Sequence, residues 1–163
     1  MYNYSAQSSA VAYVRGGRDI PDLAGEVRFY QKMNHVLVVA NIDGLPWGIG
    51  SGFYALHIHD GNACTGTDFA DTGSHYNPAE TLHPNHAGDL PPLLDCSGKA
   101  YLAVTTDRFR LADIIGRTVV IHGGPDDFRT QPAGNAGKKI ACGIIRWDVN
   151  ETEWTFFGGG HKS

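Results

Sequence analysis

The sequence predicts an all-β fold, an eight-stranded Greek-key β-barrel or sandwich with one long loop and a second, shorter loop. Eight short runs rich in β-branched and aromatic residues support this prediction, each bounded by glycine, proline, asparagine or aspartate. Twenty-one glycines and eight prolines are spread along the chain and indicate many turns. Many short strands separated by turns are typical of sandwiches and closed barrels.

The expected strands cover most of the chain outside the two loops. In order they are AVAYVR (10–15), GEVRFYQK (25–32), HVLVVANI (35–42), GFYALHIH (52–59), KAYLAVTT (99–106), RTVVIH (117–122), KIACGIIRW (139–147) and TEWTFF (152–157). The only helical pattern is LADIIG (111–116), about one turn. At 163 residues the chain suits a single domain, 1–163, with one core.

Two connections have no strand pattern. The first, residues 60–98, is unusually long for a compact domain, and loops of this length are usually functional. The second is GGPDDFRTQPAGNAGK, residues 123–138. Loops of this kind need something to hold them, and a bound metal can supply it.

Composition narrows the class of protein. Hydrophobic residues make up 42% and charged residues 18%, which is typical of a globular chain. A net charge of −4 without a basic stripe argues against nucleic acid as a partner. No apolar run approaches the roughly 18 residues of a membrane helix.

The first residues, MYNYSAQSSAVAYVRGG, lack a basic start and an apolar signal core, so we expect a cytoplasmic protein. The alternative is an exported protein whose signal has been removed.

Histidine is the most informative residue type in this chain. Six of the eight histidines fall between residues 57 and 122, and an aspartate follows the fifth of them at a spacing of three. Neutral imidazole is the commonest metal ligand at physiological pH. The candidate ligands are His57, His59, His75, His83, His86, Asp89 and His122.

One part of this set suits a copper ion. His57 and His59 stand at i and i+2 on a strand, so their rings leave the same face. Two imidazoles on a rigid strand make half of a square four-nitrogen site, which favours Cu(II), although such pairs also arise by coincidence. His122 ends another strand, and His75 precedes a turn that could aim its ring inward.

The other part suits zinc. His83, His86 and Asp89 form a tight H-x2-H-x2-D run that resembles three ligands of a tetrahedral zinc site. A solvated loop could hold the same residues by chance, but the neighbouring prolines and glycines favour ordered turns. The whole arrangement predicts a two-metal site.

Several motifs in a fixed order carry a family resemblance. They are GFYALHIHDGNAC, SHYNP, HAGDL, GRTVVIHGGPDD and GNAGKKIACGII, over about residues 25–147. Together they resemble the Cu,Zn superoxide dismutases, and the compact histidine loop with Asp-Leu-Pro-Pro (89–92) is similar to the bacterial type.

The resemblance implies a role for each candidate ligand. Copper would be bound by His57, His59, His75 and His122, and zinc by His75, His83, His86 and Asp89. His75 would then bridge the two metals as an imidazolate. Asp126 resembles the carboxylate that orients one copper and one zinc histidine, although an Asp-Asp pair can also serve a turn or cap a helix.

The same resemblance implies an enzyme that converts superoxide to oxygen and hydrogen peroxide. Copper would be reduced and reoxidised in turn, with His75 released and protonated on reduction.

Lys139 stands where the family usually has an arginine guarding the copper channel, and lysine keeps the charge but loses the planar fork. Its alternative is a solvated charge at a strand end. The second loop is short, and Arg129 is its only charge between Asp127 and Asn135, so we expect weaker steering of the anion or steering by other surfaces.

Three cysteines permit one disulfide. Cys64 and Cys142 resemble the family's intrasubunit bridge, and the alternative is two reduced thiols in a reducing cytoplasm. Cys96 has no counterpart in the resemblance and is expected to be an unpaired thiol.

Two alternatives remain open at the level of function. The same fold could hold another redox metal, such as iron, in the copper site. It could also be a non-catalytic metal-binding domain, since a fold does not guarantee an activity. A homodimer is possible, but the sequence shows no interface motif.

Overall fold

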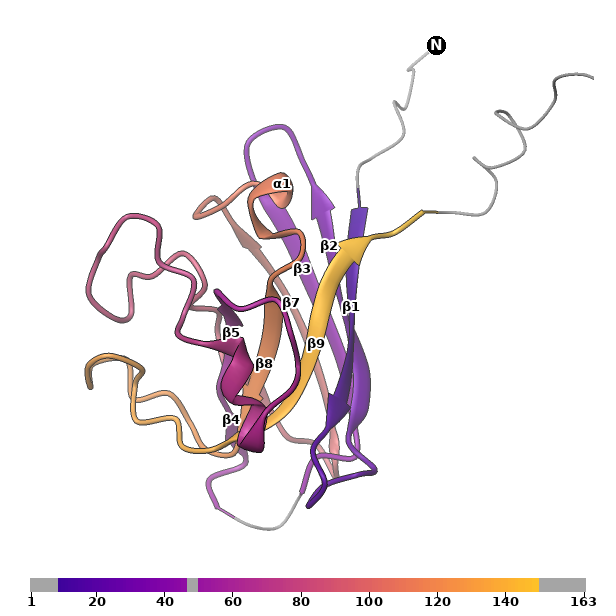
Figure 1. Cartoon of the computed structure of the whole chain (residues 1–163). Helices are drawn as coiled ribbons and strands as arrows, with labels where there is room; N and C mark the ends of the chain where they lie inside the picture. Colours follow the sequence, from indigo (N-terminus) through magenta and orange to yellow (C-terminus); the bar gives the residue numbers. More distant parts are fainter. Residues whose placement is uncertain (1–8, 47–49, 150–163) are drawn as a thin grey trace, which may run out of the picture.

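The computed structural model describes residues 9–46 and 50–149. Its main element is a curled antiparallel sheet of seven strands in the order β5-β8-β9-β1-β2-β3-β7 (Figure 1). The strands are β1 (Ser9–Gly16), β2 (Ala24–Gln31), β3 (Val36–Asp43), β5 (Leu56–His59), β7 (Lys99–Thr106), β8 (Thr118–His122) and β9 (Lys139–Trp147). The short strands β4 (Phe53–Tyr54) and β6 (Leu93–Leu94) pair with each other.

The predicted all-β fold class is confirmed. Every expected strand within the described residues forms, and α1 (Leu111–Ile114) is the helical turn that the sequence suggests, but the long loop also contains a 3₁₀ helix that was not predicted, η1 (Thr67–Thr72). The run 52–59 divides into β4 and β5 around Ala55, and β4 leaves the main sheet to pair with β6. Strand β6 was not predicted, because two leucines after a pair of prolines are too short for a strand pattern. The expected strand 152–157 lies outside the described residues.

Alternation of side chains builds the core. In β3, Val36, Val38, Ala40 and Ile42 are buried, whereas the residues between them are partly or fully exposed. The same period places Val27 and Phe29 of β2 on the inner face. Because successive side chains of a strand point to opposite faces, one face of this sheet encloses the core and the other meets solvent.

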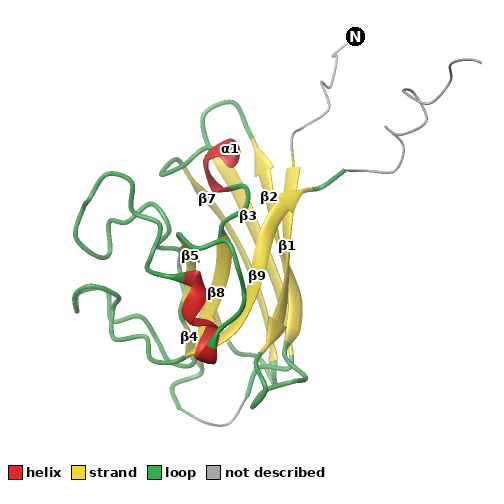
Figure 2. Cartoon of the chain, viewed as in Figure 1, coloured by secondary structure: helices red, strands yellow, loops and turns green. Residues whose placement is uncertain are grey.

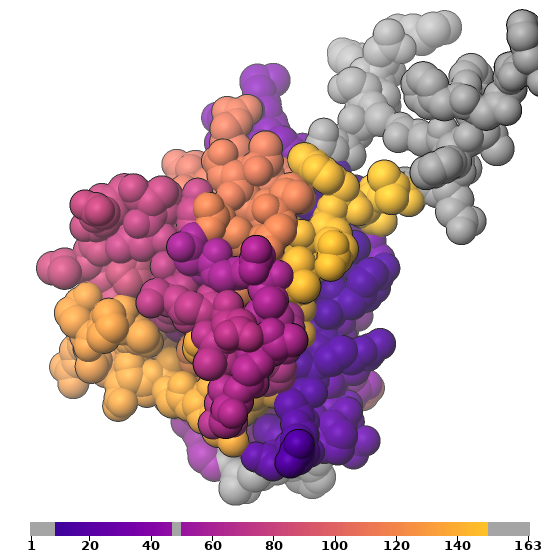
Figure 3. Space-filling model, viewed as in Figure 1, coloured from indigo at the N-terminus to yellow at the C-terminus, as the bar shows by residue number. Residues whose placement is uncertain are grey.

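The strands β5 and β8 differ from this pattern, because all their residues are buried. Leu56 and Ile58 of β5 lie in the core, and His57 and His59 leave the opposite face. That face is covered by the connections 60–98 and 123–138, which extend from the same side of the sheet (Figures 1 and 2). In the space-filling view the two loops adjoin on one face of the molecule (Figure 3). The side chains of His57 and His59 therefore lie between the sheet and the two loops that cover this face.

The long loop is hydrogen-bonded to the edge of β5 that does not face β8. The amide of Ile58 donates to Gly88 O at 2.9 Å, and the amide of Tyr76 donates to Ile58 O at 2.8 Å. These contacts place His75 opposite His59 and Asp89 opposite His57 as isolated bridges. The loop therefore brings its ligands to the strand that carries His57 and His59, two of the other three.

A disulfide also fastens the long loop to the sheet. Cys64 and Cys142 are bonded, with Cα atoms 5.7 Å apart, so the expected bridge is confirmed. Cys96 is an exposed free thiol, as expected. In the described part of the chain, no helix is long and apolar enough to cross a membrane.

Candidate metal centre

The structure brings all seven predicted ligands together in two buried groups. Within each group the candidate ligand atoms lie within 4.8 Å of one another, and one histidine belongs to both. The first group is His57, His59, His75 and His122, and the second is His75, His83, His86 and Asp89. We call them the four-histidine set and the loop set.

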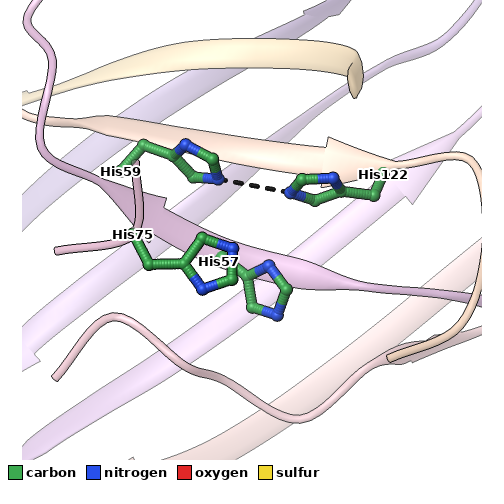
Figure 4. A group of neighbouring side chains, drawn as sticks. All are labelled: His57, His59, His75 and His122. Carbon is green, nitrogen blue, oxygen red and sulfur yellow. Dashed lines mark hydrogen bonds between the residues drawn. The ribbon is translucent and has the colours of Figure 1, made fainter. Parts of the chain in front are cut away.

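A register shift in the sheet aims His122 into the first group. The pairing of β8 with β9 is irregular between Ile121 and His122, and a bulge of this kind redirects a side chain. The amide of His122 donates to Ala55 O at 2.9 Å, which fixes the end of β8 against β5. The ring of His122 consequently faces that of His59 (Figure 4).

The protons of His59 and His122 are placed by backbone carbonyls. His59 Nδ1 donates to Gly73 O at 2.9 Å, and His122 Nδ1 donates to Gly137 O at 3.1 Å. Burial lowers the pKa of His59 to about 2 and that of His122 to about 3, so both rings are neutral and carry one proton each. Their Nε2 atoms, 3.2 Å apart, therefore direct two lone pairs at each other, an arrangement that a cation between them would stabilise (Figure 4).

Asp126 links the two groups. Its Oδ2 accepts from His57 Nε2 at 2.9 Å and its Oδ1 from His83 Nε2 at 2.8 Å. Burial alone would raise the pKa of Asp126, but hydrogen bonds from His57, the Phe128 amide and His83 hold it well below its usual range. With their protons committed to this carboxylate, His57 and His83 present Nδ1 as an acceptor. Both Nδ1 atoms are buried without a hydrogen-bond partner in the described residues.

The loop set places ring nitrogens against a carboxylate. His83 Nδ1 lies 3.0 Å from Asp89 Oδ2, and His75 Nδ1 lies 2.8 Å from Asp89 Oδ1. His86 Nδ1 lies 3.3 Å from Asp89 Oδ2, whose position is fixed by the His86 amide at 3.0 Å. The three ring nitrogens and the carboxylate thus face one another closely enough to bind one cation. Three imidazoles and one carboxylate are a donor set that suits tetrahedral zinc.

His75 is the shared residue. Its Nδ1 faces Asp89 in the loop set, and its Nε2 is buried without a hydrogen-bond partner in the described part of the chain. Its ring lies 4.0 Å from that of His57, measured between centroids (Figure 4). The two nitrogens of one ring thus serve the two groups.

Lys139 lies beside the four-histidine set. Its Nζ donates to Thr72 Oγ1 at 2.8 Å and to Gly73 O at 2.9 Å, the carbonyl that also accepts from His59. Burial lowers the pKa of Lys139. Lys139 also lines a cavity of about 510 Å³. The Lys139 ammonium and the His59 ring therefore donate to the same carbonyl, that of Gly73.

Several groups at the site carry no signal in the sequence. The carbonyls of Gly73 and Gly137 set the histidine tautomers, yet any residue has a carbonyl. Gln131 binds the backbone of His83 on both sides, with its Oε1 3.0 Å from His83 N and its Nε2 2.7 Å from His83 O. Only the glycines of the GNAG motif could have pointed to this part of the loop.

Two buried ligand groups that share one histidine, carried by a curled antiparallel sheet and two loops, define a two-metal β protein. Comparison with known proteins gives the family. The family model described as copper/zinc superoxide dismutase matches residues 23–145. The chain therefore belongs to the copper/zinc superoxide dismutase family and, with it, to the oxidoreductases that act on superoxide with copper and zinc as cofactors.

Individual relatives agree with this assignment. Superoxide dismutase [Cu-Zn] 2 of Aquifex aeolicus is 34% identical over 140 residues, which is 77% of this chain and 80% of the relative. Superoxide dismutase [Cu-Zn] of Caulobacter vibrioides is 35% identical over 155 residues, 85% of this chain and 86% of the relative. The copper chaperone for superoxide dismutase of Rattus norvegicus is 32% identical over 151 residues, 84% of this chain and 52% of the relative. Bacterial superoxide dismutases are thus among the relatives, as the loop pattern indicated.

Proposed function

We propose that this chain is a superoxide dismutase that converts superoxide to oxygen and hydrogen peroxide at a copper site bridged to zinc. Copper would be held by the four-histidine set and zinc by the loop set. The observation that supports this most strongly is His75, because its two nitrogens face the two groups. A ring can bridge two ions only if both nitrogens are available as lone pairs, and His75 Nε2 has no hydrogen-bond partner among the described residues.

When bound, copper supplies the one-electron change that lets superoxide be oxidised in one half of the reaction and reduced in the other. The protein's share is geometric. The carbonyls of Gly73 and Gly137 keep the protons of His59 and His122 on Nδ1, which leaves Nε2 as the donor atom. Asp126 keeps the proton of His57 on Nε2, which leaves Nδ1 as its donor atom. Partners that fix the tautomer and orientation of a ligand strengthen metal binding.

We propose His75 as the proton carrier of the reaction. Its Nδ1 is engaged in the loop set, so Nε2 is the atom that can take up a proton in one half of the reaction and release it in the other. Reduction of superoxide to hydrogen peroxide consumes two protons, one of which Nε2 would deliver and the other of which would come from water. A general acid within reach of the substrate typically accelerates such a step by about 10²–10⁴-fold.

Lys139 is proposed to attract and place the anionic substrate. Its ammonium is anchored by Thr72 and Gly73 next to His59, so a positive charge lies at the edge of the four-histidine set. The nearby Lys138 makes ion pairs with Asp19 and Asp68, both at 3.0 Å, which offset its charge. Lys139 is therefore the lysine of the pair that supports steering of superoxide.

The test combines metal analysis with superoxide consumption on protein purified from its own host. We expect about one copper and one zinc per chain, and His122→Ala should abolish activity while His35→Ala, on a histidine outside both sets, should not. Iron in the four-histidine set would favour the other redox metal, and zinc alone with no activity after copper loading would contradict the proposal. The single-domain organisation, the cytoplasmic location and a homodimer stay predictions, to be checked by limited proteolysis, cell fractionation and sedimentation.

A further inference from the structure

The segment that carries three of the proposed zinc ligands has little structure of its own. Residues 77–91 contain turns and an isolated bridge but no helix or strand. Its internal hydrogen bonds close short turns: the Thr81 amide donates to Asn77 Oδ1 at 3.0 Å, the Asn85 amide to Leu82 O at 2.8 Å and the Asp89 amide to His86 O at 3.2 Å. These turns set the local backbone, but the position of His86 and Asp89 relative to the sheet depends on contacts from outside the segment.

Arg108 makes such contacts from the connection between β7 and α1. Its Nη1 lies 2.9 Å from Pro84 O, 3.2 Å from His86 O and 3.4 Å from Asp89 O. Two of these carbonyls belong to proposed zinc ligands, and the third belongs to the residue after His83. The base of the arginine is fixed as well, because its amide donates to Thr106 Oγ1 at 3.2 Å.

Arg108 also lies at a cavity next to the loop set. Arg108 lines a cavity of about 380 Å³ whose wall also includes Asp89 and Asp126. The cavity thus borders a proposed zinc ligand and the carboxylate that orients His83. Arg108 closes one side of it by joining the end of β7 to the ligand loop. Within the described residues, no hydrogen bond of Arg108 reaches the strands that carry His57, His59 and His122.

We propose that Arg108 is a positioning residue that holds the zinc-binding loop in the shape in which its ligands converge, and that it acts on the loop set alone. The inference rests on the metal assignment proposed above. If the loop becomes ordered only when zinc binds, the free energy of ordering it weakens zinc binding. A loop that is already held in place avoids this loss. Arg108 Nη1, whose N–H groups are directed at neighbouring carbonyls of the loop, removes part of this cost.

The experiment uses the full chain loaded with copper and zinc and measures the affinity of each metal by competition with a chelator. Arg108→Gln should weaken zinc binding about tenfold and leave copper binding unchanged, as expected for a residue that orients ligands without touching the metal. Arg108→Lys should restore part of the zinc affinity, because an ammonium can still donate to carbonyls. The matched control is Arg110→Gln: Arg110 is exposed in the same connection, and the hydrogen bond to Asp113 comes from its amide, not its guanidinium.

Two results would overturn the inference while leaving the proposed function intact. One is an Arg108→Gln protein whose zinc affinity equals that of Arg110→Gln. The other is an equal loss of copper and zinc in Arg108→Gln, which would indicate a general structural role. A wild-type chain that binds no zinc at the loop set would instead defeat the metal assignment itself, and with it this inference.

Discussion

His57 and His83 are joined by a single carboxylate: Asp126 accepts from His57 Nε2 through one oxygen and from His83 Nε2 through the other. One ring comes from a strand of the sheet and the other from the long loop, so this contact couples the two ligand sets. The coupling is electrostatic as well as geometric, since Asp126 stays ionised through these hydrogen bonds.

Asp126→Asn should therefore weaken zinc binding by about tenfold to a hundredfold and copper binding less. An amide can accept one hydrogen bond but would turn its NH₂ toward the second ring, which leaves one histidine without its orienting partner. The loop ligand His83 should suffer more than His57, which a strand holds. Chelator competition measures both affinities. Asp127→Asn is the control, because it removes the same charge from the neighbouring position, where the contacts are to Arg129 and Thr130. Equal effects of the two substitutions would argue against a specific role of the Asp126 bridge.

Lys139→Arg should raise the rate at low superoxide concentration by about twofold to tenfold at low salt. Arginine keeps the charge and could bind Gly73 O with one N–H while directing others toward the anion. Lys139→Met should lower the rate and flatten its dependence on ionic strength, because charge steering is screened by salt. The measurement is the second-order rate constant for superoxide loss as a function of salt. An unchanged or lower rate in Lys139→Arg would refute this view of the residue.

The sequence could predict the parts of the site that follow from strand periodicity. The spacing of His57 and His59 requires that they share a face, and both are buried on it. The approach of the long loop to β5 could not be predicted from the residues alone, because backbone groups of Ile58, Tyr76 and Gly88 determine it. The same holds for Arg108, since an arginine followed by phenylalanine in a connection resembles any solvated charge. The shape of the loop set is thus a tertiary property, whereas its ligand types can be read directly.

Acid should destabilise the metal-free protein between about pH 6.5 and pH 5. Burial lowers the pKa of His59 to about 2 and that of His122 to about 3. Below the ordinary pKa of histidine, these two rings are therefore protonated in the unfolded chain but stay neutral in the folded protein. Stability from these two groups is complete above that pKa and falls with decreasing pH, by about 1.4 kcal/mol per pH unit for each ring. At pH 5 the loss amounts to about 4 kcal/mol.

Chemical denaturation of the metal-free chain at pH 7, 6 and 5 measures this loss. The copper- and zinc-loaded protein is the control, because metals that occupy the ring nitrogens exclude the protons and should keep the stability flat over this range. The carboxylates of Asp89 and Asp126, whose pKa values lie below their usual range, contribute only at lower pH. Constant stability of the metal-free chain from pH 7 to 5 would mean that the two histidines are not neutral in the fold.

Removal of the disulfide should cost up to about 4.5 kcal/mol of folding free energy in the chain-entropy model. Cys64 and Cys142 are 78 positions apart in the sequence, and a bridge that closes so long a segment restricts the unfolded chain strongly. Cys142→Ser should therefore lower the denaturation midpoint under oxidising conditions. Cys96→Ser should not, because Cys96 is an exposed free thiol. If a reductant shifts the midpoint of the wild-type chain no more than that of Cys142→Ser, the bridge does not contribute to stability.

Gly134→Ala should weaken zinc binding although Gly134 carries no ligand. A Cβ at this position would lie 2.1 Å from Asp126 Oδ1 and 2.6 Å from His83 Nε2, so it would separate the two partners of one hydrogen bond. The backbone there has φ of +70°, which adds about 1 kcal/mol of strain for any residue with a Cβ.

Gly116→Ala separates the two effects. Gly116 has a similar φ of +83°, but a Cβ there would meet no atom within 4 Å. Both substitutions should lower stability by about 1 kcal/mol through backbone strain, and only Gly134→Ala should also reduce zinc affinity, by about tenfold. Chelator competition for zinc and denaturation of the metal-free chain measure the two quantities independently. The requirement for glycine in GNAG would then follow from the space needed by the Asp126–His83 hydrogen bond rather than from the turn itself, and equal zinc affinities of the two variants would reverse that conclusion.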